Sequence, residues 1–418
     1  MGPPVCCHTW SGLFYSLAMK SSMTPVFSTL RPPACPAGRL IPALLALFPA
    51  GVLLLAPAPA DAHNHMDPGL ECRAAISKSV GKLAKAVGKT VTGCNKNRLK
   101  GTVDAGNDCS DLDAPGTDPK GKLTKSESKF VDAIAGSRSR CAGQIPGMLG
   151  YSTCPAPCDA TVPVISTMTD LANCLVCTTE SDETAMFTAS LGAPTPPLPK
   201  ADAKCHSTIA KEQSKFFGTV LKERSKCQAT AEHDGATDLT GCADLDPTGK
   251  IASARIKAQD KVSKSCGAAN LVSVDSCATT SVGDLNTCLF DEADVSAEAV
   301  FQSAYQSSAP TWAGVQAVFV QVGNCASALC HGNVPGAAGL GDIDDFDVGY
   351  DELLIEGVTC ATSLYTNRVV ANDTANSFLI AKLQGTQDCG NRMPPGGLMA
   401  QEYVDYVISW VANGAVKD

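Results

Sequence analysis

Two stretches of the chain, ECRAAISKSVGKLAKAVGKTVTGC (71–94) and KCHSTIAKEQSKFFGTVLKERSKC (204–227), match each other 133 residues apart without a gap. A constant offset of this kind is the signature of a duplicated structural unit. The sequence therefore predicts two related units. The aligned positions are Cys72 with Cys205, Cys94 with Cys227, Cys109 with Cys242, Ile76 with Ile209, Leu83 with Phe216 and Val87 with Val220.

The match continues beyond these stretches and sets the limits of the two repeats. GKL (121–123) resembles GKI (249–251), and DLANCL (170–175) resembles DLNTCL (284–289). The segment GAPTPPLP (192–199) has the composition of a linker. We assign residues 63–200 to the first repeat, 201–298 to a shorter second repeat and 299–418 to a separate C-terminal domain.

Each repeat is expected to begin with a long helix. Ile76, Val80, Leu83, Val87 and Val91 recur at steps of four, three, four and four, an apolar stripe at helical period. At 1.5 Å per residue such a helix holds its two end cysteines about 33 Å apart, so they cannot bond each other. We predict a second helix near 122–140 that returns antiparallel to the first.

The cysteines then have a simple pairing. If the second helix ends beside the start of the first, Cys141 meets Cys72, and the loop after the first helix brings Cys109 to Cys94. Motif CLVC (174–177) has the spacing of a redox dithiol, but no βαβ unit surrounds it, and a structural disulfide role is favoured. The expected disulfides are Cys72–Cys141, Cys94–Cys109, Cys205–Cys266, Cys227–Cys242, Cys277–Cys288 and Cys360–Cys389, in a mainly α fold.

Composition and the N-terminal segment both indicate export. The chain has 21 cysteines, a usage typical of proteins folded in an oxidising compartment. Residues 40–55 form an apolar run of 16 residues, followed by small residues at Ala60 and Ala62. This order predicts a signal peptide over 1–62, cleaved after Ala62, with an uncleaved anchor as the alternative. We expect a soluble mature protein in the periplasm or outside the cell.

The charge of the chain argues against one class of partner. The formal net charge is −9, and the basic residues do not cluster along the sequence. Phosphate contacts by lysine and arginine dominate the affinity of proteins for nucleic acids. Nucleic acid is therefore not an expected partner.

The last hundred residues differ in character from the repeats. NCASALCHGN (324–333) places two cysteines and a histidine within seven positions, and a Met-Pro loop follows at RMPPGG (392–397). The chain ends with ISWVANGA (408–415). Together with AGLGD (338–342) and NSFLIAKL (376–383), these motifs resemble class I c-type cytochrome domains, in particular the planctomycete-type domains of secreted bacterial proteins. The repeats resemble cysteine-rich bacterial secreted modules of unknown function.

The cytochrome resemblance implies a haem c site and assigns its residues. Cys325 and Cys330 would form the thioethers, His331 would be the proximal iron ligand and Met393 the distal ligand. A thioether ligand favours ferrous iron and raises the reduction potential. This chain departs from the common motif, because four residues rather than two separate the cysteines. The wider spacing weakens the specificity of the motif.

The resemblance implies electron transfer rather than catalysis. A single haem would pass electrons to an unidentified redox protein. A peroxidase-type enzyme is not expected, since it needs an open distal position and Met393 would fill it. The alternative is a secreted, disulfide-rich structural or binding protein with a haem-free domain of the same fold. Cys325 and Cys330 would then form a disulfide.

Overall fold

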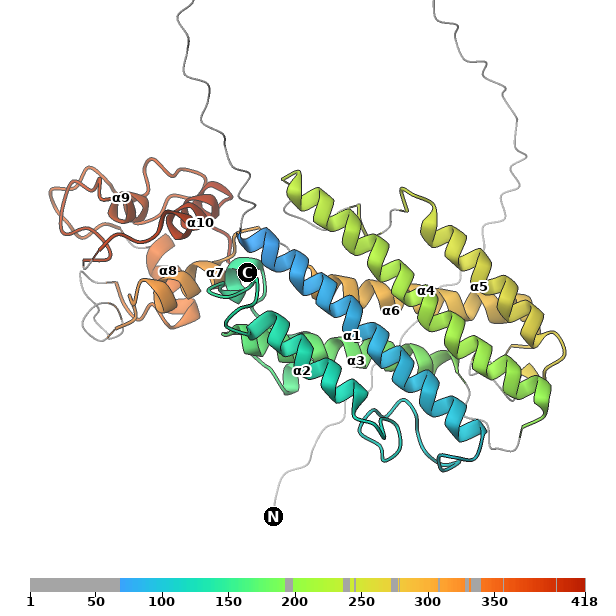
Figure 1. Cartoon of the computed structure of the whole chain (residues 1–418). Helices are drawn as coiled ribbons and strands as arrows, with labels where there is room; N and C mark the ends of the chain where they lie inside the picture. The colour runs from blue at the N-terminus through green and yellow to red at the C-terminus, as the bar shows by residue number, and fades with distance from the viewer. Residues whose placement is uncertain are drawn as a thin grey trace, which may run out of the picture. The chain divides into compact units, whose positions relative to one another are not determined.

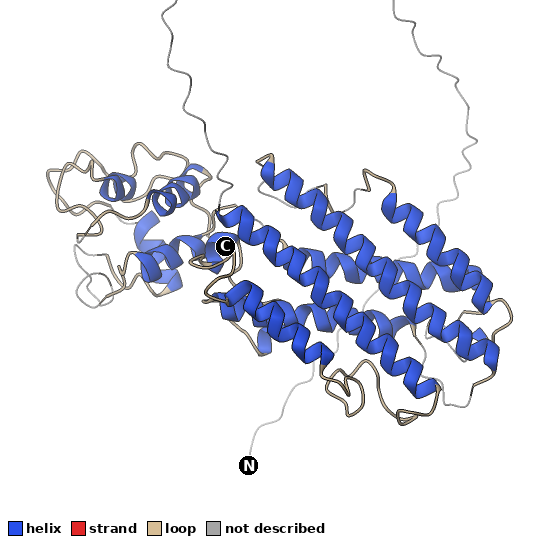
Figure 2. Cartoon of the chain, viewed as in Figure 1, coloured by secondary structure: helices blue, strands red, loops and turns tan. Residues whose placement is uncertain are grey.

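The computed structural model describes residues 68–191, 198–235, 241–243, 246–271, 277, 279–306, 309–327, 331, 340–355, 357–395 and 397–417. The predicted signal peptide, most of the predicted linker and Cys330 lie outside these residues. The prediction of a mainly α fold is confirmed, because helices dominate the described part (Figure 2). An isolated antiparallel bridge between Gly357 and Asn367 is the β pairing that this part contains.

Each repeat consists of three helices. The first helix of each is the longest, and both extend beyond the predicted stretches at each end. Both helices are this long because neither has an internal proline or a glycine with positive φ. The helices of the first repeat are α1 (Pro68–Leu99), α2 (Lys122–Ala135) and α3 (Met168–Ser190), and those of the second are α4 (Lys200–His233), α5 (Lys250–Cys266) and α6 (Val282–Ala304) (Figure 1).

The duplicated motifs are helix starts. Thr167 Oγ1 accepts a hydrogen bond of 3.1 Å from the backbone N–H of Asp170 at the start of α3. Ser281 Oγ accepts the equivalent 3.1 Å bond from Asp284 at the start of α6. Such capping satisfies N–H groups that the helix itself leaves without acceptors. The shared Asp-Leu dipeptides of the two repeats therefore mark the third helix in each.

All six expected disulfides occur in the structure. Cys72–Cys141 and Cys205–Cys266 have the same Cα–Cα distance, 4.6 Å, and Cys94–Cys109 and Cys227–Cys242 share 5.6 Å, so the repeats are alike in three dimensions. Cys277–Cys288 and Cys360–Cys389 are also present. Two further bridges, Cys154–Cys174 and Cys158–Cys177, tie the start of α3 to the loop before it.

The two repeats share one hydrophobic core. It runs from Cys72 to Tyr305 and includes the apolar stripes of both long helices. Helices α1 and α4 lie side by side and run antiparallel, since Arg73 at the start of α1 bonds Glu232 at the end of α4 (Figure 1). Because each three-helix unit has an apolar face left over, the pairing of two units buries both.

The C-terminal part has a separate core built on tryptophans. Trp312 and Trp410 are buried with ring centroids 5.6 Å apart, and each indole N–H donates to a backbone carbonyl, of Phe346 and Val416 respectively. Short helices surround this pair. They are α7 (Trp312–Ala317), the π-helix η4 (Val318–Val322), α8 (Phe346–Leu354), α9 (Phe378–Gln384) and α10 (Gln401–Ala412).

A helix that spans a bilayer needs about 20 mostly apolar residues. Within the described ranges, no helix combines that length with that apolar character.

Candidate functional site

The site begins where the first helix of the C-terminal part ends. The backbone passes from α7 into η4, and the N–H of Cys325 donates a 2.8 Å hydrogen bond to the carbonyl of Phe319. Gly323 lies so close to the Cys325 side chain that a Cβ there would be 2.7 Å from Sγ. Cys325 is half-buried and packs against the tryptophan core. The η4 turn thus fixes the direction of this thiol.

His331 is held beside Cys325. Its backbone N–H donates to the carbonyl of Cys325 at 2.9 Å, and its own carbonyl accepts from Ile343 at 3.0 Å. The side chain is 6% exposed. Burial lowers the pKa of the imidazole, and the ring is therefore neutral at pH 7 and able to bind a metal ion.

One ring nitrogen of His331 has a backbone acceptor. Nδ1 lies 3.4 Å from the carbonyl oxygen of Leu340. A carbonyl can only accept, so this contact requires the proton on Nδ1 and leaves the lone pair on Nε2. Metal-binding histidines commonly use this arrangement, in which an outer acceptor sets the tautomer and orients the ring. The geometry favours Nε2 as the ligating atom.

An ion pair between buried Arg368 and half-buried Glu352 supports the loop that carries Leu340. The N–H of the next residue, Gly341, donates to the carboxylate of Glu352. Glu352 also faces Arg368, with Nη1 and Oε2 3.5 Å apart, and Arg368 is 7% exposed. The charge of Arg368 lowers the pKa of His331, while that of Glu352 raises it, and both effects are secondary to burial. Sequence reasoning missed this pair, because nothing in the spacing links 352, 368 and 331.

Met393 lies on a loop that α9 anchors. Its N–H donates to the carbonyl of Lys382 at 3.1 Å. The ammonium of Lys382 donates in turn to the carbonyls of Cys389 and Asn391, at 2.9 and 2.7 Å. Cys389 is bridged to Cys360, so three kinds of bond hold the segment just before Met393.

The structure brings Cys325 and His331 together but does not pair Met393 with them. Within the described part of the chain, no hydrogen bond joins the Met393 loop to either residue. A different methionine, Met399, lies beside the glycine that adjoins Cys325. Met399 is buried, and its terminal methyl carbon would be 3.2 Å from a Cβ on Gly323, the same glycine that adjoins Cys325 Sγ. The sequence signal for Met399 was its place two residues before the last helix.

The described residues contain no group of three or more His, Cys, Asp and Glu side chains placed to hold a metal ion. A haem iron bound by one histidine and one methionine would not form such a group. The CLVC cysteines pair with Cys154 and Cys158 rather than with each other. As the sequence favoured, they have a structural role.

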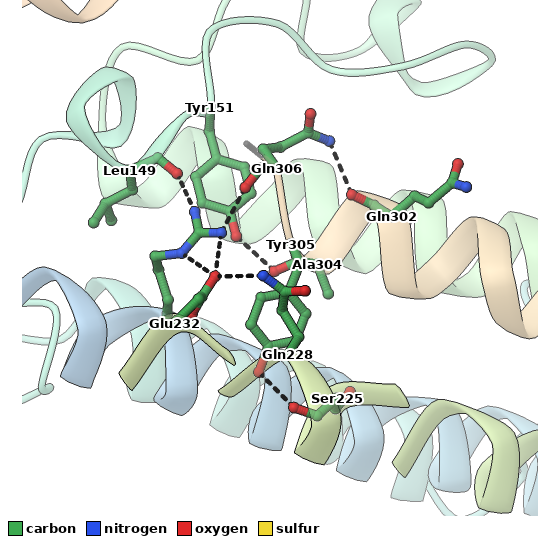
Figure 3. A network of polar contacts seen from close by, with 10 residues as sticks. Leu149, Tyr151, Ser225, Gln228, Glu232, Gln302, Ala304, Tyr305 and Gln306 are labelled. Carbon is green, nitrogen blue, oxygen red and sulfur yellow. Dashed lines mark hydrogen bonds and ion pairs between the residues drawn. The ribbon is translucent and has the colours of Figure 1, made fainter. Parts of the chain in front are cut away.

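The repeats contain one extensive buried polar network. The guanidinium of Arg73 donates twice to Glu232 Oε1, at 2.6 and 2.9 Å, and also to the carbonyls of Leu149 and Gln306 (Figure 3). Tyr151 donates to the carbonyl of Ala304 at 2.6 Å. Because each guanidinium nitrogen has a carbonyl or carboxylate acceptor, this network locks the two repeats together, and it presents no open chemistry.

Comparisons with protein-family models, curated proteins and solved structures found no match to this chain. The assignment of a function therefore depends on the residues themselves.

Proposed function

We propose that the C-terminal part is a single-haem electron-transfer domain of the c type, exported with the repeats to an oxidising compartment. The observation that carries the proposal is the state of His331. A neutral, buried imidazole beside Cys325, with Nδ1 facing a carbonyl, has the donor set that a haem ligand needs.

The residue types present match those that the motif implies for haem binding. Cys325 and Cys330 would hold the haem covalently, and His331 would bind the iron through Nε2. Met393 would supply a second, weaker donor to the iron from its anchored loop. The haem itself supplies the reversible one-electron change of iron. Leu340, Glu352 and Arg368 would keep the imidazole oriented.

Electron transfer fits these residues better than catalysis. A methionine donor occupies the position at which an oxidant would bind and raises the reduction potential. Apolar side chains near the site are exposed, among them Val322 beside Gly323 and Leu398 beside Met399. Val322 directly precedes the glycine that adjoins the Cys325 thiol, and Leu398 directly precedes the methionine whose methyl group lies by that glycine. A haem edge would cover such surface.

The test is the visible spectrum of the mature protein made in a bacterial host with cytochrome c maturation machinery. We expect a sharp α-band after reduction with dithionite. His331→Ala should lose the low-spin spectrum, while Gln384→Ala, at an exposed position on the same part of the chain, should keep it. A colourless wild-type protein would overturn the proposal and leave the haem-free, disulfide-stapled alternative.

A further inference from the structure

A groove on the repeats lies between α1 and α4. Its volume is about 720 Å³, within the range of ligand sites in proteins. Along α1 the lining runs from Ala74 to Thr92, about 27 Å at the helical rise. The groove is therefore long.

The floor of the groove is mostly apolar. Ala84, Phe217 and Leu221 line it and are almost fully buried. Two exposed glycines, Gly81 on α1 and Gly218 on α4, keep it open, since a Cβ at either position would meet nothing within 4 Å. These residues offer a surface for an apolar chain.

Lysines form both edges of the groove, which we call the lysine rim. Helix α1 contributes Lys78, Lys82, Lys85 and Lys89. Their steps of four, three and four place them on one helical face. The described residues offer none of these four a carboxylate within 4.0 Å.

Helix α4 contributes the rest of the lysine rim, Lys211, Lys215, Lys222 and Lys226. Lys215 pairs with Glu212 at 3.0 Å. Three of the rim positions occur in both repeats at the offset of 133, so the lysines belong to the duplicated pattern. Eight positive charges around one groove contrast with the net charge of −9 for the whole chain.

One acid lies on the floor without a bonding partner. Glu183 of α3 is fully buried, and neither of its carboxylate oxygens has a hydrogen-bond partner among the described residues. It lies against Gly88 and Ser214, where α1 and α4 cross. Burial raises the pKa of Glu183 well above the usual range. A buried polar group of this kind needs a partner from water or a ligand.

We infer that the groove binds a free, single-chain anionic amphiphile, such as a long-chain carboxylate. The apolar floor would take the chain and the lysine rim its anionic group. Charge complementarity selects the anion, and the concave apolar floor between two helices suits a single chain rather than the face of a bilayer. Nucleic acid would use the charge but not the buried apolar floor.

Titration of the mature protein with dodecanoate below its micellar concentration tests this inference. We expect saturable binding by calorimetry, and binding at least tenfold weaker in Gly81→Phe and Gly218→Phe, which fill the groove. Gly93→Phe is the matched control, because Gly93 also has open space around its Cβ position but lies outside this groove. Circular dichroism would verify that each variant is folded.

Charge-reversal variants test whether the lysines of the rim bind dodecanoate specifically or whether any positive surface charge attracts it. Lys78→Glu with Lys211→Glu should weaken dodecanoate binding at least tenfold, whereas Lys129→Glu on α2 should leave it unchanged. Dodecanol, which lacks the charge, should bind more weakly than dodecanoate. Titrations with phosphatidylglycerol vesicles and with a DNA duplex test whether the lysine rim instead binds a membrane or nucleic acid.

The inference is overturned if dodecanoate fails to bind, or if both phenylalanine variants bind it as the wild type does. If the wild type and the phenylalanine variants bind vesicles or DNA equally well, and dodecanoate does not bind, the lysine rim would instead be a site for a membrane or for nucleic acid. Neither result bears on the haem proposal, because the groove belongs to the repeats.

Discussion

Met393 and Met399 are the two residues on which the redox chemistry of the proposed site depends. Met393 matches the motif and sits on an anchored loop, whereas Met399 is buried beside Gly323 and Cys325. The sequence context of Met393, which lies between an arginine and two prolines, predicts that Met393 is the iron ligand. The packing of the described residues, which places Met399 in the core against which Cys325 packs, favours the second. A substitution at each position separates them.

Met393→His should lower the reduction potential of the haem protein by roughly 0.1 V or more, out of the ~0.8 V over which axial ligands set haem potentials. Imidazole favours ferric iron more than a thioether does. Met399→Leu, a volume-conserving change, should leave the potential within a few hundredths of a volt. Spectroelectrochemical titration measures both. The opposite pattern would make Met399 the ligand and remove Met393 from that role.

Two glycines on α1 illustrate how a single position decides helix packing. Gly81 faces open space, while a Cβ on Gly88 would collide with the side chains of Ser214 and Glu183. Gly81→Ala should therefore stabilise the protein by up to about 1 kcal/mol, through helix propensity. Gly88→Ala should destabilise it by about 1–3 kcal/mol, through overpacking.

Urea unfolding followed by circular dichroism measures this difference, with the disulfides left intact. The two variants change the same residue type on the same helix, so propensity cancels between them. Equal effects of the two substitutions would contradict the close approach of α1, α3 and α4 at Gly88.

At the scale of whole elements, periodicity predicted much of the fold. The apolar stripe from Ile76 to Val91 and the aligned cysteines were sufficient to predict α1, α2 and the pairs Cys72–Cys141 and Cys94–Cys109. They sufficed because a helix has fixed length per residue, and each bridge needs its cysteines within a few ångströms.

Other elements could not be predicted in this way. The π-helix η4 depends on the packing of Phe319 and on the turn to Cys325, which no local pattern encodes. The ion pair of Glu352 and Arg368 and the position of Glu183 arise where distant segments meet. The rim lysines of α1 were visible as a helical stripe in the sequence. The groove that they border could not be predicted, because it forms only where the lysines of α4 lie opposite those of α1.

For the whole molecule, α3 gives the stability a definite dependence on pH. Burial raises the pKa of Glu183 well above that of an unfolded chain, raises that of Glu180 to about 8, with nearby Glu127 adding to it, and raises that of Asp182 to about 6. Between about pH 4.5 and these values the unfolded chain has released protons that the folded chain retains. The free energy of unfolding must therefore fall as the pH rises through this window.

Glu183→Gln should reduce that slope by roughly 1.4 kcal/mol per pH unit above about pH 4.5, because glutamine cannot ionise in either state. The variant should match the wild type near pH 4 and exceed it in stability at pH 7. Unfolding midpoints in urea at a series of pH values provide the measurement. A variant less stable than the wild type at pH 7 would show that Glu183 is ionised and bonded in the folded protein.

The most direct test of the central claim is the mass of the proteolytic peptide that contains both Cys325 and Cys330, taken from mature protein made with cytochrome c maturation machinery. The account predicts that this peptide carries one haem through two thioether bonds, and that the peptide from a Cys325→Ala, Cys330→Ala variant carries none. A wild-type peptide whose mass equals its amino acids less the two hydrogens of a Cys325–Cys330 disulfide would contradict the account.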